Sequence, residues 1–150
     1  MSTKNVQFTV ATHVLAGLAH CAAQGGAGVT SAALAGSVNA EPSFVRRAIS
    51  KLAKAGLVTT TRGKNGACSL ARPASSITLL DIYRASEAPA TFSIHDYPIE
   101  GACPISANIS VCMSDVLACA QQGFEERLAR RTLAEMLAQM CPLARQGSAG

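Results

Sequence analysis

The sequence predicts a mainly α-helical fold: a winged helix-turn-helix with a two-stranded β-hairpin wing, followed by a long C-terminal helix. Three observations predict this fold. The first half of the chain has the element order helix, short helix, helix, hairpin and helix. Positive charge is concentrated in residues 41–72, around the third helix and the hairpin. Apolar residues then recur at helical spacing from residue 106 to about residue 140.

The composition indicates a folded protein of one domain. The chain has 150 residues, of which 49% are hydrophobic and 15% are charged, so the hydrophobicity is too high for a disordered chain. No apolar run approaches the ~20 residues of a membrane span, and the N-terminal sequence lacks the features of a signal peptide. We therefore expect a cytoplasmic protein without membrane association. Its six cysteines are then expected as free thiols or metal ligands rather than disulfides.

Three helices are predicted in the first third of the chain. Residues 6–23 have apolar side chains at helical spacing. Thr30 or Ser31 caps a short second helix. A third helix runs from residue 43 to 55, opened by Pro42, whose missing N–H costs nothing in a first turn. The apolar side expected to be buried on this third helix consists of Phe44 or Val45, Ala48, Ile49 and Leu52.

The wing is predicted as a hairpin of two strands. Residues 57–61 are rich in β-branched side chains and read as the first strand. Residues 67–71 form the second strand. The Asn-Gly pair within residues 62–66 is the strongest short-range signal for a tight hairpin turn.

A fourth helix completes the first region. It covers residues 79–86 and is capped by Ser76 or Thr78. Residues 87–105 contain three prolines and no helical period, and they are interpreted as a linker. These boundaries define a winged helix-turn-helix domain at residues 1–86.

The C-terminal third is predicted to be one amphipathic helix over residues 106–141. Some 30 helical residues span about 45 Å, more than the first domain can cover. The long apolar stripe is therefore expected to pack on a second copy of the chain, so that this is a dimerisation helix. The alternative is that it folds back on its own domain. Residues 142–150 are expected to be a disordered tail.

The charge distribution points to double-stranded DNA as the partner. Residues 41–72 carry seven basic side chains against one acidic, whereas the whole chain has a net charge of +4. The second helix of a helix-turn-helix enters the major groove, where arginine can read guanine and lysine mostly neutralises phosphate. Aromatic residues make up only 4%, which argues against stacking on single strands. The predicted DNA-binding residues are Ser31, Ser43, Arg46, Arg47, Ser50, Lys51, Lys54 and, on the wing, Arg62 and Lys64.

Specific segments resemble the Rrf-two (Rrf2) family of bacterial winged-helix transcriptional regulators. These segments are VTSAALAGSVNAEPSFVRRAISKLAKAGLVTTTRGKNGACSLARP and ITLLDIYRASE, and the later CPISANISVCMSDVLACAQQGFEERLARRTLAEML is similar to the family's dimerisation region. The resemblance implies a homodimer that binds a near-palindromic operator and usually represses. Some relatives sense through a two-iron two-sulfur cluster held by three cysteines, and others are cluster-free and respond to thiol chemistry or a partner enzyme. The family's usual Gly-Gly-aromatic wing sequence reads Gly66-Ala67-Cys68 here.

Three cysteines lie where the cluster-binding relatives carry theirs. Cys103, Cys112 and Cys119 are separated by eight and six residues, whereas the cluster-binding pattern is tighter. On one helix, Cys112 and Cys119 lie about 10 Å apart along the axis, too far to share a small cluster or to form a disulfide with each other. The start CPIS resembles the cluster-free branch. Cys103, placed before a helix N-terminus that favours the thiolate, is the best candidate for a reactive, redox-sensing thiol.

The resulting prediction is a homodimeric DNA-binding transcriptional regulator, acting as a repressor and responding to oxidation or another effector through Cys103, with no cofactor. One alternative is a regulator that senses through an iron–sulfur cluster on Cys103, Cys112 and Cys119. Another is an adaptor that uses the winged helix to dock a protein. An enzyme with Cys103 as nucleophile and His95 as base is not predicted, because the sequence identifies no third, orienting residue.

Overall fold

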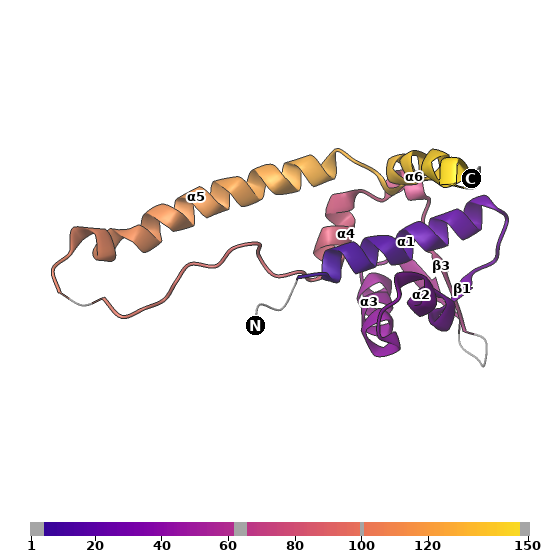
Figure 1. Cartoon of the computed structure of the whole chain (residues 1–150), viewed down its shortest axis with the longest axis horizontal. Coiled ribbons are helices and arrows are strands. Elements are labelled where there is room, and N and C mark those ends of the chain that lie inside the picture. Colours follow the sequence, from indigo (N-terminus) through magenta and orange to yellow (C-terminus); the bar gives the residue numbers. More distant parts are fainter. Residues whose placement is uncertain (1–4, 62–65, 100, 148–150) are drawn as a thin grey trace.

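The computed structural model describes residues 5–61, 66–99 and 101–147, the last six of these by their backbone. A domain of helices and a small sheet comes first, an extended linker then runs away from it, and one long helix comes back from the far end of the linker (Figure 1). A final helix packs on the domain. The helices are α1 (Gln7–Ala23), α2 (Ser31–Val38), α3 (Pro42–Lys54), α4 (Leu79–Ala85), α5 (Pro104–Ala129) and α6 (Leu133–Gly147), with a short 3-10 turn at Ala74–Ser76.

The first three helices form as predicted. Of the two predicted caps of α2, Thr30 is the one used: its hydroxyl accepts a hydrogen bond from the Ala33 N–H at 3.1 Å. Asn39 ends α2 in the left-handed conformation, with φ of 59°. Helix α3 starts at Pro42. The residues of α3 that are fully buried are Val45, Ile49 and Leu52, while Phe44 and Ala48 are half-buried.

The sheet has three strands, where the sequence predicted two. Strand β3 (Ala67–Leu70) pairs antiparallel with β2 (Val58–Thr60) on one side and with β1 (Val29–Thr30) on the other. A two-residue strand has no alternation of its own, so β1 left no periodic signal. Gly28 permits this pairing, because a Cβ atom there would lie 3.0 Å from the carbonyl oxygen of Cys68.

Helix α4 is fixed by a capping box rather than by Ser76. The Thr78 hydroxyl accepts from the Asp81 N–H at 3.1 Å, and the Asp81 carboxylate accepts from the Thr78 N–H at 2.9 Å. The Arg72 guanidinium donates to the same carboxylate at 3.2 Å. Arg72, one of the seven basic side chains of residues 41–72, therefore forms a salt bridge within the domain.

The prediction of one continuous C-terminal helix over residues 106–141 is wrong. The chain breaks between α5 and α6, where the Leu79 N–H donates to the Arg131 carbonyl at 2.9 Å and the Leu133 N–H donates to the Ile77 carbonyl at 2.8 Å. These two hydrogen bonds join residues 131–133 to the extended segment 77–79 and replace the hydrogen bonds that a continuous helix would make. Leu133 is 0% exposed, and α6 packs on α1, so this part folds back on its own domain. Helix α6 also continues through Gly147, so the predicted disordered tail is wrong for residues 142–147.

Helix α5 is joined to the domain mainly at its C-terminal part. An edge-to-face chain of rings runs from Phe8 through Tyr83 to Phe124, with centroid separations of 5.6 and 5.3 Å. The Gln121 side chain donates to the Tyr83 hydroxyl at 2.9 Å. The rest of α5, 26 residues and about 39 Å long in all, has no fully buried side chain. Among the described residues, no helix is long and apolar enough to cross a membrane.

Candidate nucleic-acid interface

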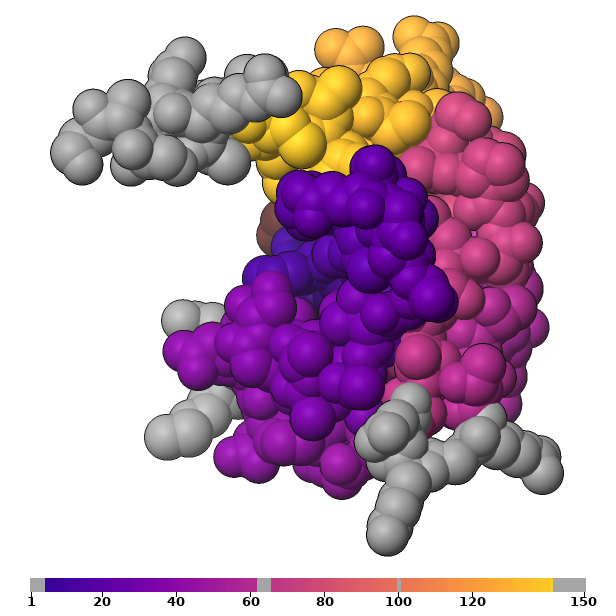
Figure 2. All heavy atoms as spheres, turned by 90° about the vertical axis from the view of Figure 1, so that its right-hand side faces the viewer, coloured from indigo at the N-terminus to yellow at the C-terminus, as the bar shows by residue number. Residues whose placement is uncertain are grey.

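Helix α3 presents an exposed polar face opposite its buried one. Because Val45, Ile49 and Leu52 anchor it to the core, the other side of the helix faces solvent. In Figure 2 the α2–α3 part of the domain lies at the opposite end from α6, which therefore leaves it uncovered. The predicted residues of α3 that are exposed are Ser43, Arg46, Arg47, Ser50 and Lys54.

Arg46 and Ser31 lie beside the same hollow between α2 and α3. Asn39 and Pro42 also line this hollow, whose volume is about 320 Å³. Ser31 is the first residue of α2, since Thr30 is the cap. An anion in the hollow would meet the positive end of α2 and the Arg46 guanidinium together.

Arg47 and Lys51 differ in what holds them. The Arg47 guanidinium carbon lies 5.8 Å from the centroid of the Phe44 ring, a cation–π contact that leaves the charge facing solvent. The Lys51 ammonium lies 3.4 Å from the Glu87 carboxylate and is only half-exposed. Lys51 is thus at the edge of the face, and its charge is partly neutralised. Sequence reasoning missed both neighbours: the contact of Phe44 with Arg47 could have been found from their i, i+3 spacing on one helix, whereas Glu87 comes from a distant segment and leaves no such signal.

Two predicted wing residues, Arg62 and Lys64, lie outside the described residues. The base of the wing is described: the Thr61 N–H donates to the Ala67 carbonyl at 3.0 Å, and the Ala67 N–H donates to the Thr61 hydroxyl at 3.0 Å. The Thr61 hydroxyl thus extends the strand pairing by one residue. Within the part of the chain that the structure describes, Arg46, Arg47 and Lys54 take part in no salt bridge. Among the described basic residues of this region, the unpaired positive charge is therefore on α3.

Cys103 occupies the N-terminal end of α5 and is exposed. The Ser106 N–H, the Ser106 hydroxyl and the Ile105 N–H form hydrogen bonds that lower the pKa of the Cys103 thiol. Cys68 behaves in the opposite way, because burial raises the pKa of its thiol. The His95 ring packs against the Tyr97 ring at a centroid distance of 5.9 Å. His95 is not among the groups that change the pKa of the Cys103 thiol.

Cys103, just before α5, and Cys112 and Cys119 within it are too far apart to bind one iron–sulfur cluster. Cys112 and Cys119 follow Cys103 by nine and sixteen residues, about 13 and 24 Å along a helix axis. Thiolates that ligate one small cluster must surround it within a few ångströms. No group of three or more His, Cys, Asp or Glu side chains among the described residues is close enough to hold a metal ion. The observed conformation of one chain therefore does not present a cluster site on these cysteines.

A winged helix with an exposed basic recognition helix is the architecture of a DNA-binding transcriptional regulator. The model of the Rrf2 family, described as "Iron-dependent Transcriptional regulator", matches residues 5–139. The chain therefore belongs to the Rrf2 family of transcriptional regulators, and it is not an enzyme.

Relatives agree with this assignment. The chain is 34% identical over 109 residues to Bacillus subtilis (strain 168) YwnA, provisionally described as an HTH-type transcriptional regulator; the match covers 72% of this chain and 80% of YwnA. A crystal structure of a provisionally named transcriptional regulator from Lactobacillus plantarum shares 26% identity with a TM-score of 0.76, covering 97% of this chain and 99% of that one. IscR of T. potens (23% identity, TM-score 0.66, covering 93% of this chain and 88% of that one) and CymR of B. subtilis (21%, 0.61, covering 93% and 98%) share the fold.

Proposed function

We propose that this regulator binds a near-palindromic operator in double-stranded DNA as a homodimer and acts as a repressor. The observation that carries the proposal is the exposed face of α3, where Arg46, Arg47 and Lys54 form no salt bridge with any described residue, while the opposite face is buried in the core. Arginines in the N-terminal half of a recognition helix are placed to reach base edges. Lys54, in the last turn, is placed for phosphate.

The homodimer is supported by α5. A helix about 39 Å long without a buried side chain has an apolar surface that one chain leaves uncovered. Two-fold packing of two such helices would hold two α3 helices apart on one duplex. The half-sites of such dimers are separated by about 34 Å, one helical turn of DNA, or a multiple of it.

Regulation by oxidation is proposed at Cys103. The thiol is exposed, and its lowered pKa increases the fraction of the reactive thiolate at neutral pH. A peroxide would convert this thiolate to a sulfenic acid. The helix that begins at this residue is the one proposed to hold the dimer together, so a change there would be transmitted to the spacing of the DNA-reading helices.

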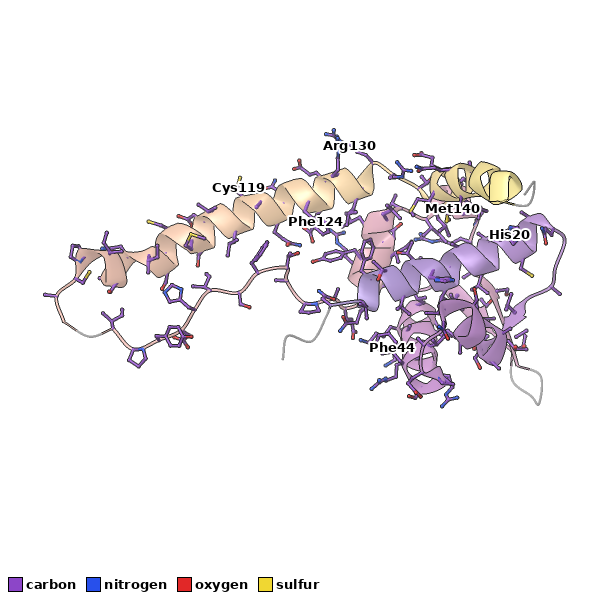
Figure 3. The ribbon with its side chains drawn as sticks, viewed as in Figure 1. His20, Phe44, Cys119, Phe124, Arg130 and Met140 are labelled. Atoms are coloured by element: carbon purple, nitrogen blue, oxygen red, sulfur yellow. The ribbon has the colours of Figure 1, made fainter. Side chains whose placement is uncertain are left out.

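The test is a binding titration with a fluorescent duplex selected from a random-sequence pool by the wild-type protein. Binding should weaken steeply as salt rises, because several phosphates are neutralised. Replacing Arg46 or Arg47 with alanine should cost about 1–3 kcal/mol if either reads a base. Arg130→Ala is the matched control, since Arg130 is exposed at the end of α5, on the opposite side of the molecule from α3 (Figure 3), and should leave affinity unchanged. The proposal would be contradicted by absence of duplex binding at low salt. It would also be contradicted if the variant with both Arg46→Ala and Arg47→Ala bound the duplex as tightly as wild type.

A further inference from the structure

Helix α5 has a second apolar stripe that faces away from its own domain. Leu117 and Phe124 lie on the side that meets the linker and α4. A different set recurs with alternating steps of four and three residues, the spacing of a seam between two packed helices. This set, called the outer seam, consists of Ile105, Ile109, Cys112, Val116, Cys119 and Gly123.

The outer seam is largely open to solvent in the single chain, except at its N-terminal end, where Ile105 and the half-buried Ile109 line a hollow beside linker residues 95–99. Ile105 is 70% exposed and Val116 is 58% exposed, and Cys112 and Cys119 are exposed as well. Figure 3 shows Cys119 on the side of α5 away from the linker, whereas Phe124 points the other way. Exposed apolar side chains at seam spacing favour another helix as the occupant.

A second copy in antiparallel orientation fits this seam, because the seam is complementary to itself. With Val116 on the two-fold axis, Cys112 faces the partner's Cys119, and Ile109 faces the partner's Gly123, so that a large side chain meets a small one. A parallel pair would instead place Gly123 against its own copy and leave a gap. It would also bring both domains to the same end of the helices.

The two thiols would then be within bonding distance. Packed helix axes are about 8–10 Å apart, and Cα atoms lie about 2.3 Å from their axis, which leaves facing Cα atoms about 3.4–5.4 Å apart. A disulfide needs a Cα separation of about 4.4–6.8 Å. We propose that Cys112 of one subunit and Cys119 of the partner subunit form a redox-sensitive thiol pair, two per dimer, that locks the α5 helices together. This inference rests on the proposed homodimer.

The oxidant is a peroxide. The Cys112 or Cys119 thiolate attacks the O–O bond of hydrogen peroxide, and the thiol becomes a sulfenic acid with release of one water. The facing thiolate then attacks the sulfenic sulfur, the S–S bond forms, and a second water leaves. Each pair of thiols thus gives up two electrons and two hydrogens to one peroxide, and the helices become covalently joined.

The test is covalent dimer formation by the full-length protein after peroxide treatment, measured on non-reducing gels with peptide mapping of the linked cysteines. Wild type should give a dimer linked through Cys112 and Cys119. Cys112→Ser and Cys119→Ser should each reduce this dimer at least about tenfold, because every bond needs both residues. An equimolar mixture of the two variants should restore one link, in mixed dimers only. Cys103→Ser is the matched control and should still form the mapped bond.

Two outcomes would overturn the inference. If either single variant still forms a covalent dimer through its remaining cysteine and its own copy, the helices are parallel. If wild type is dimeric by sedimentation and binds duplex DNA but forms no Cys112–Cys119 bond, the thiol pair fails while the proposed function stands. A monomer in sedimentation would remove both. Thermal unfolding checks that the two serine variants are folded. Cys112 and Cys119 are exposed, so both positions should tolerate the change.

Discussion

Helices α5 and α6 have similar apolar stripes but different surroundings. Helix α6 packs on α1, and its first residue, Leu133, is completely buried. Helix α5 has 26 residues and none of them is fully buried. The short break between them, held by the Leu133 N–H and the Ile77 carbonyl, separates a helix whose apolar surface is covered within the chain from one whose surface is not.

An apolar stripe therefore shows that a helix needs a packing partner, but it does not show which one. Leu133 reaches the core because the segment around Ile77 offers backbone hydrogen bonds beside α1. Beyond the aromatic contact of Phe124 with Tyr83, α5 extends past the domain. Substitutions in α6 should therefore affect unfolding, whereas substitutions on the outer seam should affect association.

The largest effect is expected from Leu133→Ala. Removing a fully buried leucine side chain leaves a cavity, and the free energy of unfolding should fall by about 2–5 kcal/mol. Chemical denaturation measures this change. Val111→Ala is the control, because Val111 is 64% exposed and its truncation should change stability by less than about 0.5 kcal/mol. Equal effects of the two substitutions would contradict the contrast between the helices.

Val116→Lys should break the proposed dimer with little effect on the fold. Two lysines on a two-fold axis repel each other and lose the apolar contact, so the dimer dissociation constant should rise at least about tenfold, or 1.4 kcal/mol. Analytical ultracentrifugation measures this constant. Val111→Lys, on another side of α5 and similarly exposed, should leave it unchanged. A dimer that is insensitive to Val116→Lys would exclude the outer seam as the interface.

A smaller effect is expected on thiol reactivity, which should differ between Cys103 at the start of α5 and Cys68 in the domain. Hydrogen bonds from Ser106 and Ile105 lower the pKa of Cys103, so its thiolate should be present at lower pH than an ordinary cysteine allows. The rate of alkylation by iodoacetamide should therefore reach its plateau at lower pH in the native protein than in the unfolded one. Burial raises the pKa of Cys68, which should alkylate slowly.

Ser106→Ala separates the contributions to this effect. It removes the hydroxyl hydrogen bond and keeps the backbone ones, so the alkylation profile of Cys103 should move part of the way toward higher pH. Mass spectrometry of the Cys103 peptide over a pH series gives the profile. A native profile identical to that of the unfolded protein would show that the helix terminus does not activate this thiol.

Much of the domain could be predicted from local signals. Pro42 marked the start of α3, and the spacing of Val45, Ile49 and Leu52 identified its buried side before any contact was known. The β-branched run of residues 57–61 and the Asn-Gly pair predicted a hairpin, and β2 and β3 do pair antiparallel; the predicted turn lies mostly outside the described residues. These features depend on neighbours within a few residues, so the sequence contains the necessary information.

Other features depend on residues far apart in the chain. Strand β1 exists because Val29 meets Cys68, and the break before α6 exists because Leu133 meets Ile77. The five-residue step from Leu128 to Leu133 was a signal of the break, since a continuous helix repeats its apolar positions every three or four residues. In the candidate interface, the contact of Lys51 with Glu87 was equally invisible from spacing.

By itself, the amino-acid order determined which segments are helical, which side of α3 is apolar, and where positive charge accumulates, because each of these is set within one or two turns of chain. Tertiary contacts set the pairing of Lys51 with Glu87, the bend in the C-terminal region, and the absence of fully buried side chains on α5. Those outcomes depend on hydrogen bonds and burial between distant segments, and their free energy exists only once the segments have been brought together.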